Sequence, residues 1–117
     1  MSDNHLDSAV LSTLQDVMEG DFPILLDTFI ADSEERLDAL REALARNDPQ
    51  AIRMAAHSFK GSCSNMGATL LAESCRNLED LGRREQLADA PRLFEQIERE
   101  FAIVRILLKT ERQRFLR

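Results

Sequence analysis

Apolar residues recur every three or four positions along most of this chain, a spacing typical of amphipathic helices. The pattern predicts five helices. A short helix covers 7–18, a second begins at 21, a third covers 49–66, a fourth covers 69–81 and a long fifth begins near 89. Each of the last four carries one apolar stripe, so each needs neighbours that cover that stripe.

The predicted helix ends coincide with residues suited to them. Asp48 can accept hydrogen bonds at the start of the third helix, and Pro49 fits its first position, where no backbone N–H is needed. Asp21 is expected to cap the second helix in the same way. Glycine readily adopts the left-handed conformation that often ends a helix, and three glycines are expected to act as stops: Gly20, Gly67 and Gly82.

The links between the second, third and fourth helices are short, which makes these helices antiparallel neighbours. Four apolar stripes can then close on one another around a common core. We therefore expect an all-α fold, an antiparallel up-down four-helix bundle with a short additional N-terminal helix over one end. Residues 1–117 are expected to form a single domain.

The composition indicates a helical globular protein and argues against two classes of function, nucleic-acid binding and membrane association. The chain of 117 residues is 44% hydrophobic and 31% charged, with no Trp or Tyr, whereas β-rich proteins favour aromatic residues. A net charge of −6 argues against nucleic-acid binding, which needs a basic surface. The sequence has no apolar run of membrane-spanning length and no signal-peptide pattern, so we expect a cytoplasmic protein without membrane association.

Residues 55–67, AAHSFKGSCSNMG, form an unusual combination for the interior of a predicted helix. Gly61 lies in the predicted helix interior, where a glycine lowers helix stability by about 1 kcal/mol relative to alanine. At 100° per residue, His57 points roughly 150° away from the apolar face, and therefore towards solvent. Lys60 and Gly61 follow His57 by three and four positions and lie over it. Ser64 continues the same surface.

These residue types suit the transfer of a phosphoryl group. A neutral imidazole is a good nucleophile near pH 7. Lys60 supplies a positive charge that can interact with a phosphoryl group. Gly61 removes a side chain that would otherwise cover the imidazole, so its cost to the helix is explained if a partner must reach His57.

The segment resembles the signature of histidine phosphotransfer (HPt) domains. These carry a histidine on a helix, a lysine and a glycine three and four positions later, and another glycine near the helix end. Phe59 stands where the family usually has leucine, but the position is apolar in both cases. The resemblance covers roughly residues 20–110, and the short chain is similar to the stand-alone bacterial type. Four residues match the signature: His57, Lys60, Gly61 and Gly67.

This resemblance implies an intermediate of a phosphorelay. A receiver domain bearing phospho-aspartate, usually that of a hybrid sensor kinase, would give its phosphoryl group to His57. His57 would then pass the group to the aspartate of a response regulator. The partner receiver domain would supply Mg²⁺, and no cofactor is expected in this chain. The protein would be a carrier rather than an enzyme, and we expect a monomer that docks receivers transiently.

Other residues are assigned weaker or structural roles. Ser64 fits either a neighbour of the phosphoryl group or an ordinary surface residue. Met54 fits either an apolar docking contact or a scattered exposed methionine. Gly67 is interpreted as the helix stop of the motif. His5 lies in a segment expected to fray, and it is assigned no role.

An alternative from another functional class is a non-catalytic helical adaptor that binds a partner protein without phosphoryl transfer. In that case His57 and Lys60 are ordinary surface residues. A nucleotide-using kinase is disfavoured, because the sequence has no glycine-rich phosphate loop. No metal site is expected, since metal sites in bundles use Glu-x-x-His motifs that project inward. Cys63 and Cys75 have no CxxC spacing and are interpreted as buried free thiols.

Overall fold

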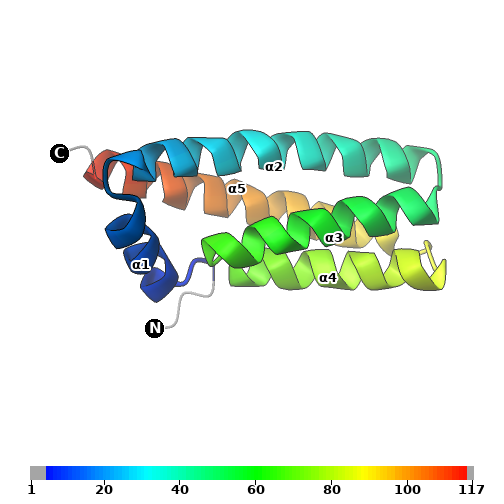
Figure 1. The fold of residues 1–117 in the computed structure, drawn as a ribbon. Coiled ribbons are helices and arrows are strands. Elements are labelled where there is room, and N and C mark those ends of the chain that lie inside the picture. The colour runs from blue at the N-terminus through cyan, green and yellow to red at the C-terminus, as the bar shows by residue number, and fades with distance from the viewer. Residues whose placement is uncertain (1–4, 116–117) are drawn as a thin grey trace.

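The structure, a computed structural model, describes residues 5–115, and within that range it contains five α-helices. Four long helices run antiparallel, and a shorter helix lies across one end (Figure 1). A 3₁₀ turn, η1 (Glu19–Asp21), links the first two helices. The helices are α1 (Ser8–Met18), α2 (Phe22–Ala45), α3 (Pro49–Met66), α4 (Thr69–Arg84) and α5 (Ala90–Phe115).

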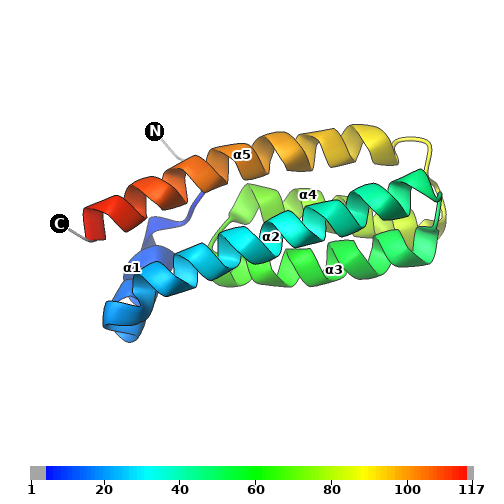
Figure 2. The ribbon, with the colours of Figure 1, turned by 90° about the horizontal axis from the view of Figure 1, so that it is seen from above.

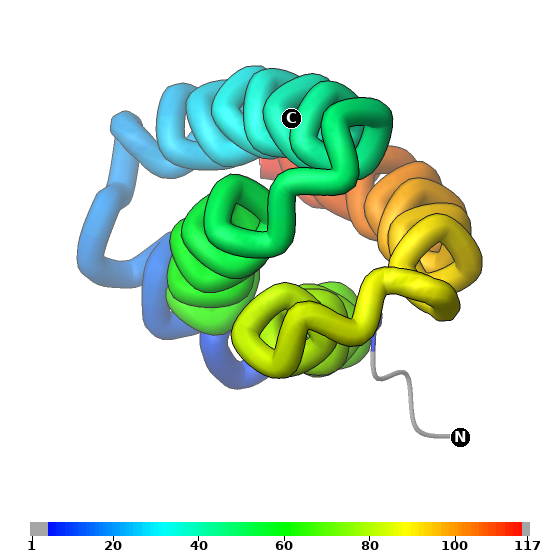
Figure 3. Tube along the Cα trace, turned by 90° about the vertical axis from the view of Figure 1, so that its right-hand side faces the viewer, coloured from blue at the N-terminus to red at the C-terminus, as the bar shows by residue number. Residues whose placement is uncertain are grey.

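The four long helices follow one another around a common core. The end-on view shows the order α2, α3, α4 and α5, so that each helix packs against the next and α5 returns to α2 (Figure 3). Seen from above, α1 lies at the end of the bundle where α2 begins and α5 ends (Figure 2). The predicted all-α four-helix bundle with an additional N-terminal helix is therefore confirmed.

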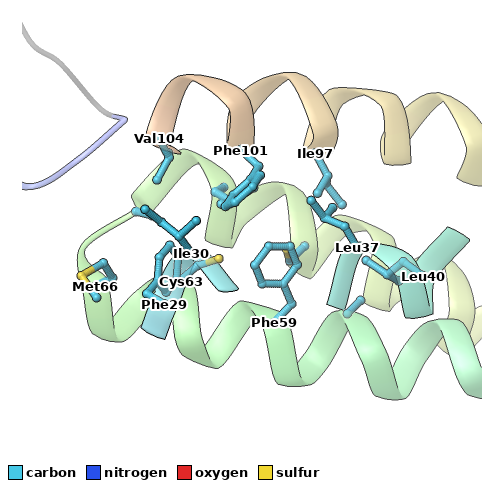
Figure 4. Packing of buried hydrophobic residues seen from close by; sticks show 14 of the residues in the cluster. Phe29, Ile30, Leu37, Leu40, Phe59, Cys63, Met66, Ile97, Phe101 and Val104 are labelled. Carbon is cyan, nitrogen blue, oxygen red and sulfur yellow. The ribbon is translucent and has the colours of Figure 1, made fainter. Parts of the chain in front are cut away.

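The core fixes how α3 is rotated. Ile52, Phe59 and Cys63 are completely buried, and Figure 4 shows Phe59 directed inward, towards the part of α5 that carries Ile97 and Phe101. Burying a large apolar side chain contributes about 1.5–3 kcal/mol to stability. Because these anchors share one side of α3, the opposite side of the helix faces outward.

A short turn holds α3 and α4 side by side. Gly67 ends α3 with φ of 78°, in the left-handed region, and Ala68 then leads into α4. The N–H of Asp7 donates to the carbonyl of Gly67 at 2.8 Å. A Cβ on Gly67 would lie 3.0 Å from Cβ of Val10 in α1. The turn therefore also anchors the N-terminal helix to the end of the bundle.

Helix capping agrees with the prediction at one helix start and differs at another. Asp48 accepts a hydrogen bond from the N–H of Ala51 at 3.1 Å, as expected for the cap of α3. Asp21 makes no side-chain capping bond, because it belongs to the 3₁₀ turn and has helical dihedral angles itself. The prediction that Gly20 ends the first helix was also wrong. Gly20 lies inside η1, and Glu19 is the residue with positive φ that follows α1.

The prediction that Gly82 ends the fourth helix was wrong. Helix α4 continues to Arg84, and Glu85 ends it with φ of 57°. Gly82 is buried against the start of α3. A Cβ there would lie 2.9 Å from both the amide nitrogen of Arg53 and the carbonyl oxygen of Pro49. The glycine therefore permits the close approach of two helices, and it does not end α4.

The expectation that the segment around His5 frays was also wrong. Nδ1 of His5 lies 2.6 Å from Oε2 of Glu100, so this residue is tied to α5. The thiols agree with the prediction, since Cys63 and Cys75 are both free and buried. Hydrogen bonding to Cys75 and burial raise the pKa of the Cys63 thiol. None of the helices within residues 5–115 is long and apolar enough to cross a membrane.

Candidate functional site

His57 lies midway along the outward side of α3. Its side chain is 65% exposed, whereas Ala56 and Phe59 beside it are completely buried. The helical repeat thus produces the orientation predicted from the sequence, with the core residues turned in and the imidazole turned out. The imidazole is open to a protein that docks on α3.

A carboxylate from the neighbouring helix holds the imidazole. Nδ1 of His57 lies 2.9 Å from Oε2 of Glu79 on α4, and the Glu79 side chain is only 18% exposed. His57 and Glu79 each lie eleven positions from Ala68 in the sequence. In two antiparallel helices joined by a short turn, positions at similar distances from the turn lie near each other. The fold therefore brings this pair together, although the sequence analysis did not select Glu79.

Lys60 reaches the same carboxylate. Its ammonium nitrogen lies 2.8 Å from Oε1 of Glu79, and its side chain is 29% exposed. Oε1 is buried and has no well-directed hydrogen bond, so the ammonium acts as its counter-charge. The helical spacing predicted that Lys60 lies over His57. Instead, the structure turns Lys60 towards α4, where one carboxylate joins Lys60 and His57.

The charge of Glu79 determines which nitrogen of His57 is available. Burial alone would raise the pKa of Glu79, but its contacts with Lys60 and His57 outweigh burial and hold that pKa below its usual range. An ionised carboxylate can only accept hydrogen bonds, so Nδ1 of His57 must carry the proton. The lone pair of the neutral ring then lies on Nε2, which makes Nε2 the nucleophilic atom.

Gly61 leaves open space beside the imidazole. A Cβ on Gly61 would have no atom of the described residues within 4 Å, apart from its chain neighbours and the nearby backbone of α3. Space is therefore present at this position, and the access role of Gly61 stays a prediction. Ser64, one turn further along α3, is exposed as well. Met54 is 58% exposed on the same helix, and its sulfur lies 3.9 Å from Nε2 of Gln50.

Comparison with known proteins agrees with this geometry. The model of the Hpt domain family matches residues 24–107. The solved structure of histidine-containing phosphotransfer protein B (HptB) from Pseudomonas aeruginosa PAO1 is 62% identical in sequence and has a TM-score of 0.94. The match covers 97% of this chain and 98% of that one. Comparison with curated protein sequences gave no match.

The chain belongs to the Hpt domain family. It is therefore a histidine phosphotransfer protein, and Hpt proteins are phosphocarriers rather than classical enzymes. Gly67 of the Hpt signature lies in the turn after α3, where its positive φ and its contact with Val10 give it a structural position. Within residues 5–115 no group of three or more His, Cys, Asp or Glu side chains is arranged to hold a metal ion.

A second charged residue near the site also escaped the sequence analysis. Arg36 of α2 donates a hydrogen bond from Nη1 to the hydroxyl of Ser58, the residue after His57. Its Nε is buried without a hydrogen-bond partner in the structure. Arg36 is far from His57 in the sequence, and the packing of α2 on α3 brings it to Ser58. Two cations therefore contact neighbours of His57, Lys60 at Glu79 and Arg36 at Ser58.

Proposed function

We propose that this Hpt protein carries a phosphoryl group on Nε2 of His57 between the receiver domains of a multistep phosphorelay. The donor is the phospho-aspartate of a receiver domain, usually that of a hybrid sensor kinase. The acceptor is the aspartate of a response regulator. The observation that carries this proposal is the paired state of His57, whose Nδ1 is held by Glu79 while the ring is exposed on α3.

The chemistry follows from the position of the lone pair. Nε2 attacks the phosphorus of the aspartyl phosphate, and the new N–P bond forms as the P–O bond to the aspartate breaks. The aspartate leaves as a carboxylate. The reverse reaction, with a second receiver, restores the free imidazole. Because Nε2 carries no proton, this chain does not need a general base for the attack.

The residues around His57 are proposed to assist this transfer without accepting the group. Lys60, which shares Glu79 with His57, would offer its ammonium to the phosphoryl oxygen atoms, and Gly61 would leave room for the receiver. Mg²⁺ is expected in the partner receiver domain, where it would neutralise charge on the transferring group. Transfer on this chain then depends on partner receivers rather than on a resident cofactor.

The proposed docking surface surrounds the imidazole on α3 and continues onto α1 and α2. A shallow hollow lies between these three helices, and apolar side chains from each contribute to its lining. Such a surface suits a small, transient complex, because a carrier must release one receiver before it meets the next. We therefore expect weak binding and a monomeric free protein. The lining includes Leu14, Leu25, Phe29, Ser62, Asn65 and Met66.

The test is transfer from a purified receiver domain that carries radiolabelled phospho-aspartate. Wild type should take up label, His57→Gln should not, and His5→Gln should behave as wild type. His5→Gln is a matched control because it removes the other histidine, which contacts Glu100 of α5. The label should be lost in acid and kept in alkali, as expected of a phosphoramidate.

Two outcomes would contradict the proposal. Label on His57→Gln would move the acceptor to another residue, and acid-stable label would point to Ser58, Ser62 or Ser64. Receiver binding without any label on the wild type would support the alternative, a helical adaptor.

A further inference from the structure

The group that holds His57 is charged, and this charge has consequences for the phosphorylated state. Orientation of the ring needs only a hydrogen-bond acceptor at Nδ1, which a neutral amide would also provide. The structure instead places a carboxylate 2.9 Å from Nδ1 and keeps it ionised with Lys60. A negative charge at this distance stabilises a positive ring over a neutral ring.

The protonation of the ring decides how well histidine releases a phosphoryl group. When Nε2 forms its bond to phosphorus, a ring that keeps its Nδ1 proton becomes a positively charged imidazolium. When the N–P bond breaks again, that ring leaves as a neutral imidazole. A ring that has lost the Nδ1 proton would have to leave as an imidazolate anion, which is a much poorer leaving group.

We infer that Glu79 keeps the Nδ1 proton on His57 through the whole transfer cycle, so that the phosphorylated ring stays an imidazolium and returns its phosphoryl group as neutral imidazole. In both directions the electron pair of the broken bond stays with the leaving atom, oxygen on the way in and Nε2 on the way out. No proton is exchanged with solvent. This inference rests on the proposed function and gives Glu79 a positioning role that acts through its charge.

The other charged groups near the ring work against an imidazolium. Along α3, Arg53 precedes His57 by four positions and Lys60 follows it by three, and α2 contributes Arg36 through Ser58. These cations favour an uncharged ring, so a carboxylate in direct contact with Nδ1 is needed to offset them. On α4, Arg76 and Arg83 lie about one turn to either side of Glu79, and the acid Asp80 forms ion pairs with Arg83 and Arg84.

The experiment separates charge from orientation. Wild type and Glu79→Gln would be phosphorylated with phosphoramidate, a small donor that needs no receiver, and the decay of phosphohistidine would be followed against pH. Glu79→Gln keeps an oxygen acceptor for Nδ1–H but removes the charge. Asp80→Asn is the matched control, because it removes an acid from the adjacent position of the same helix. Nitrogen-15 NMR of the histidine ring reports its protonation directly.

Glu79→Gln should shift the titration of the phosphorylated ring towards acid by about one pH unit. Above the midpoint, its phosphohistidine should consequently live about tenfold longer and return its phosphoryl group to a receiver more slowly. Asp80→Asn should follow the wild-type profile. Coincident profiles for wild type and Glu79→Gln would overturn the inference.

A second measurement covers the case in which Glu79→Gln folds poorly. In phosphorylated wild type, the ring should titrate at higher pH in the folded protein than in the same protein unfolded in urea. An equal or lower midpoint in the folded protein would overturn the inference. The proposed function fails separately, if neither a phosphorylated receiver nor phosphoramidate places a phosphoryl group on His57 of the wild type.

Discussion

The ammonium of Lys60 lies 2.8 Å from Oε1 of Glu79, so in the free protein its charge is directed to α4 and away from the open side of the imidazole. A phosphoryl group on His57 would compete with Glu79 for this ammonium. The lysine side chain is long enough to serve both partners, but the benefit to the phosphoryl group is then only partial. We therefore expect Lys60 to have an auxiliary role beside His57.

Replacement of Lys60 should therefore slow transfer without abolishing it. Lys60→Ala should still accept label on His57, but more slowly or with lower occupancy, because the charge near the phosphoryl group is lost. Lys60→Arg should recover part of the loss, since it keeps the charge with a different shape. The time course of transfer from one receiver, compared among the three forms, measures this. Equal rates for wild type and Lys60→Ala would return Lys60 to a purely structural pairing with Glu79.

His57→Gln should separate function from stability. The side chain is 65% exposed, so its replacement should change the free energy of unfolding by no more than about 0.5 kcal/mol. Phosphoryl acceptance should be abolished. Thermal unfolding by circular dichroism and the transfer assay together check both parts. A large drop in melting temperature would show that the imidazole supports the fold rather than serving a partner.

Gly61 should respond in opposite ways to small and large side chains. Gly61→Ala adds a methyl group in open space and should stabilise the protein by up to about 1 kcal/mol, because it removes a mid-helix glycine. Gly61→Gln should slow transfer, since its side chain would crowd the imidazole and the docked receiver. Urea unfolding and transfer rates measure the two effects. If Gly61→Gln transferred at the wild-type rate, the proposed access role of Gly61 would be wrong.

Local signals in the sequence were sufficient for the helices and for the outward orientation of His57. The spacing of apolar residues placed Phe59 inward and His57 outward, and both positions agree with the structure. Asp48 was recognisable as a cap, because its hydrogen bond is made within one turn of helix. These features depend on residues close together in the chain, where periodicity and capping rules apply.

Contacts between helices were harder to predict. Glu79 belongs to the polar side of α4, and periodicity alone does not distinguish it from other exposed acids. The short turn of the α3–α4 hairpin was a usable signal, because it places position 79 near His57. Gly82 was misinterpreted for a related reason. A glycine that ends a helix and one that admits a neighbouring backbone look alike in a single sequence.

The two helical glycines, Gly61 and Gly82, should therefore differ in their response to alanine. A Cβ at Gly82 would lie 2.9 Å from backbone atoms of Pro49 and Arg53, which cannot move without shifting α3. Gly82→Ala should destabilise the protein by about 1–3 kcal/mol through overpacking, whereas Gly61→Ala should stabilise it. Urea unfolding of both variants provides the comparison. A stabilised Gly82→Ala would contradict the close packing of α3 on α4.

Glu79 should also make the stability of the fold depend on pH in the acid range. Burial opposes its ionisation, but Lys60 and His57 lower its pKa in the folded protein below the ordinary value. A carboxyl group with a lower pKa in the folded state stabilises the fold above its unfolded pKa, about 4.3 for glutamate. It loses that contribution as the pH falls through its folded pKa. Below about pH 4, wild type should therefore lose free energy of unfolding more steeply than Glu79→Gln.

Urea unfolding at about pH 7, 5 and 3 tests this dependence, with Glu73→Gln as the matched control. Glu73 is an exposed acid on the same helix, so its variant should follow the wild-type curve. The advantage of wild type over Glu79→Gln should be complete near neutral pH and should shrink as the carboxylate is protonated. Parallel curves for wild type and Glu79→Gln would show that the carboxylate is no more stabilised in the folded protein than in the unfolded chain. In that case the contacts from Lys60 and His57 to Glu79 would contribute nothing to the fold.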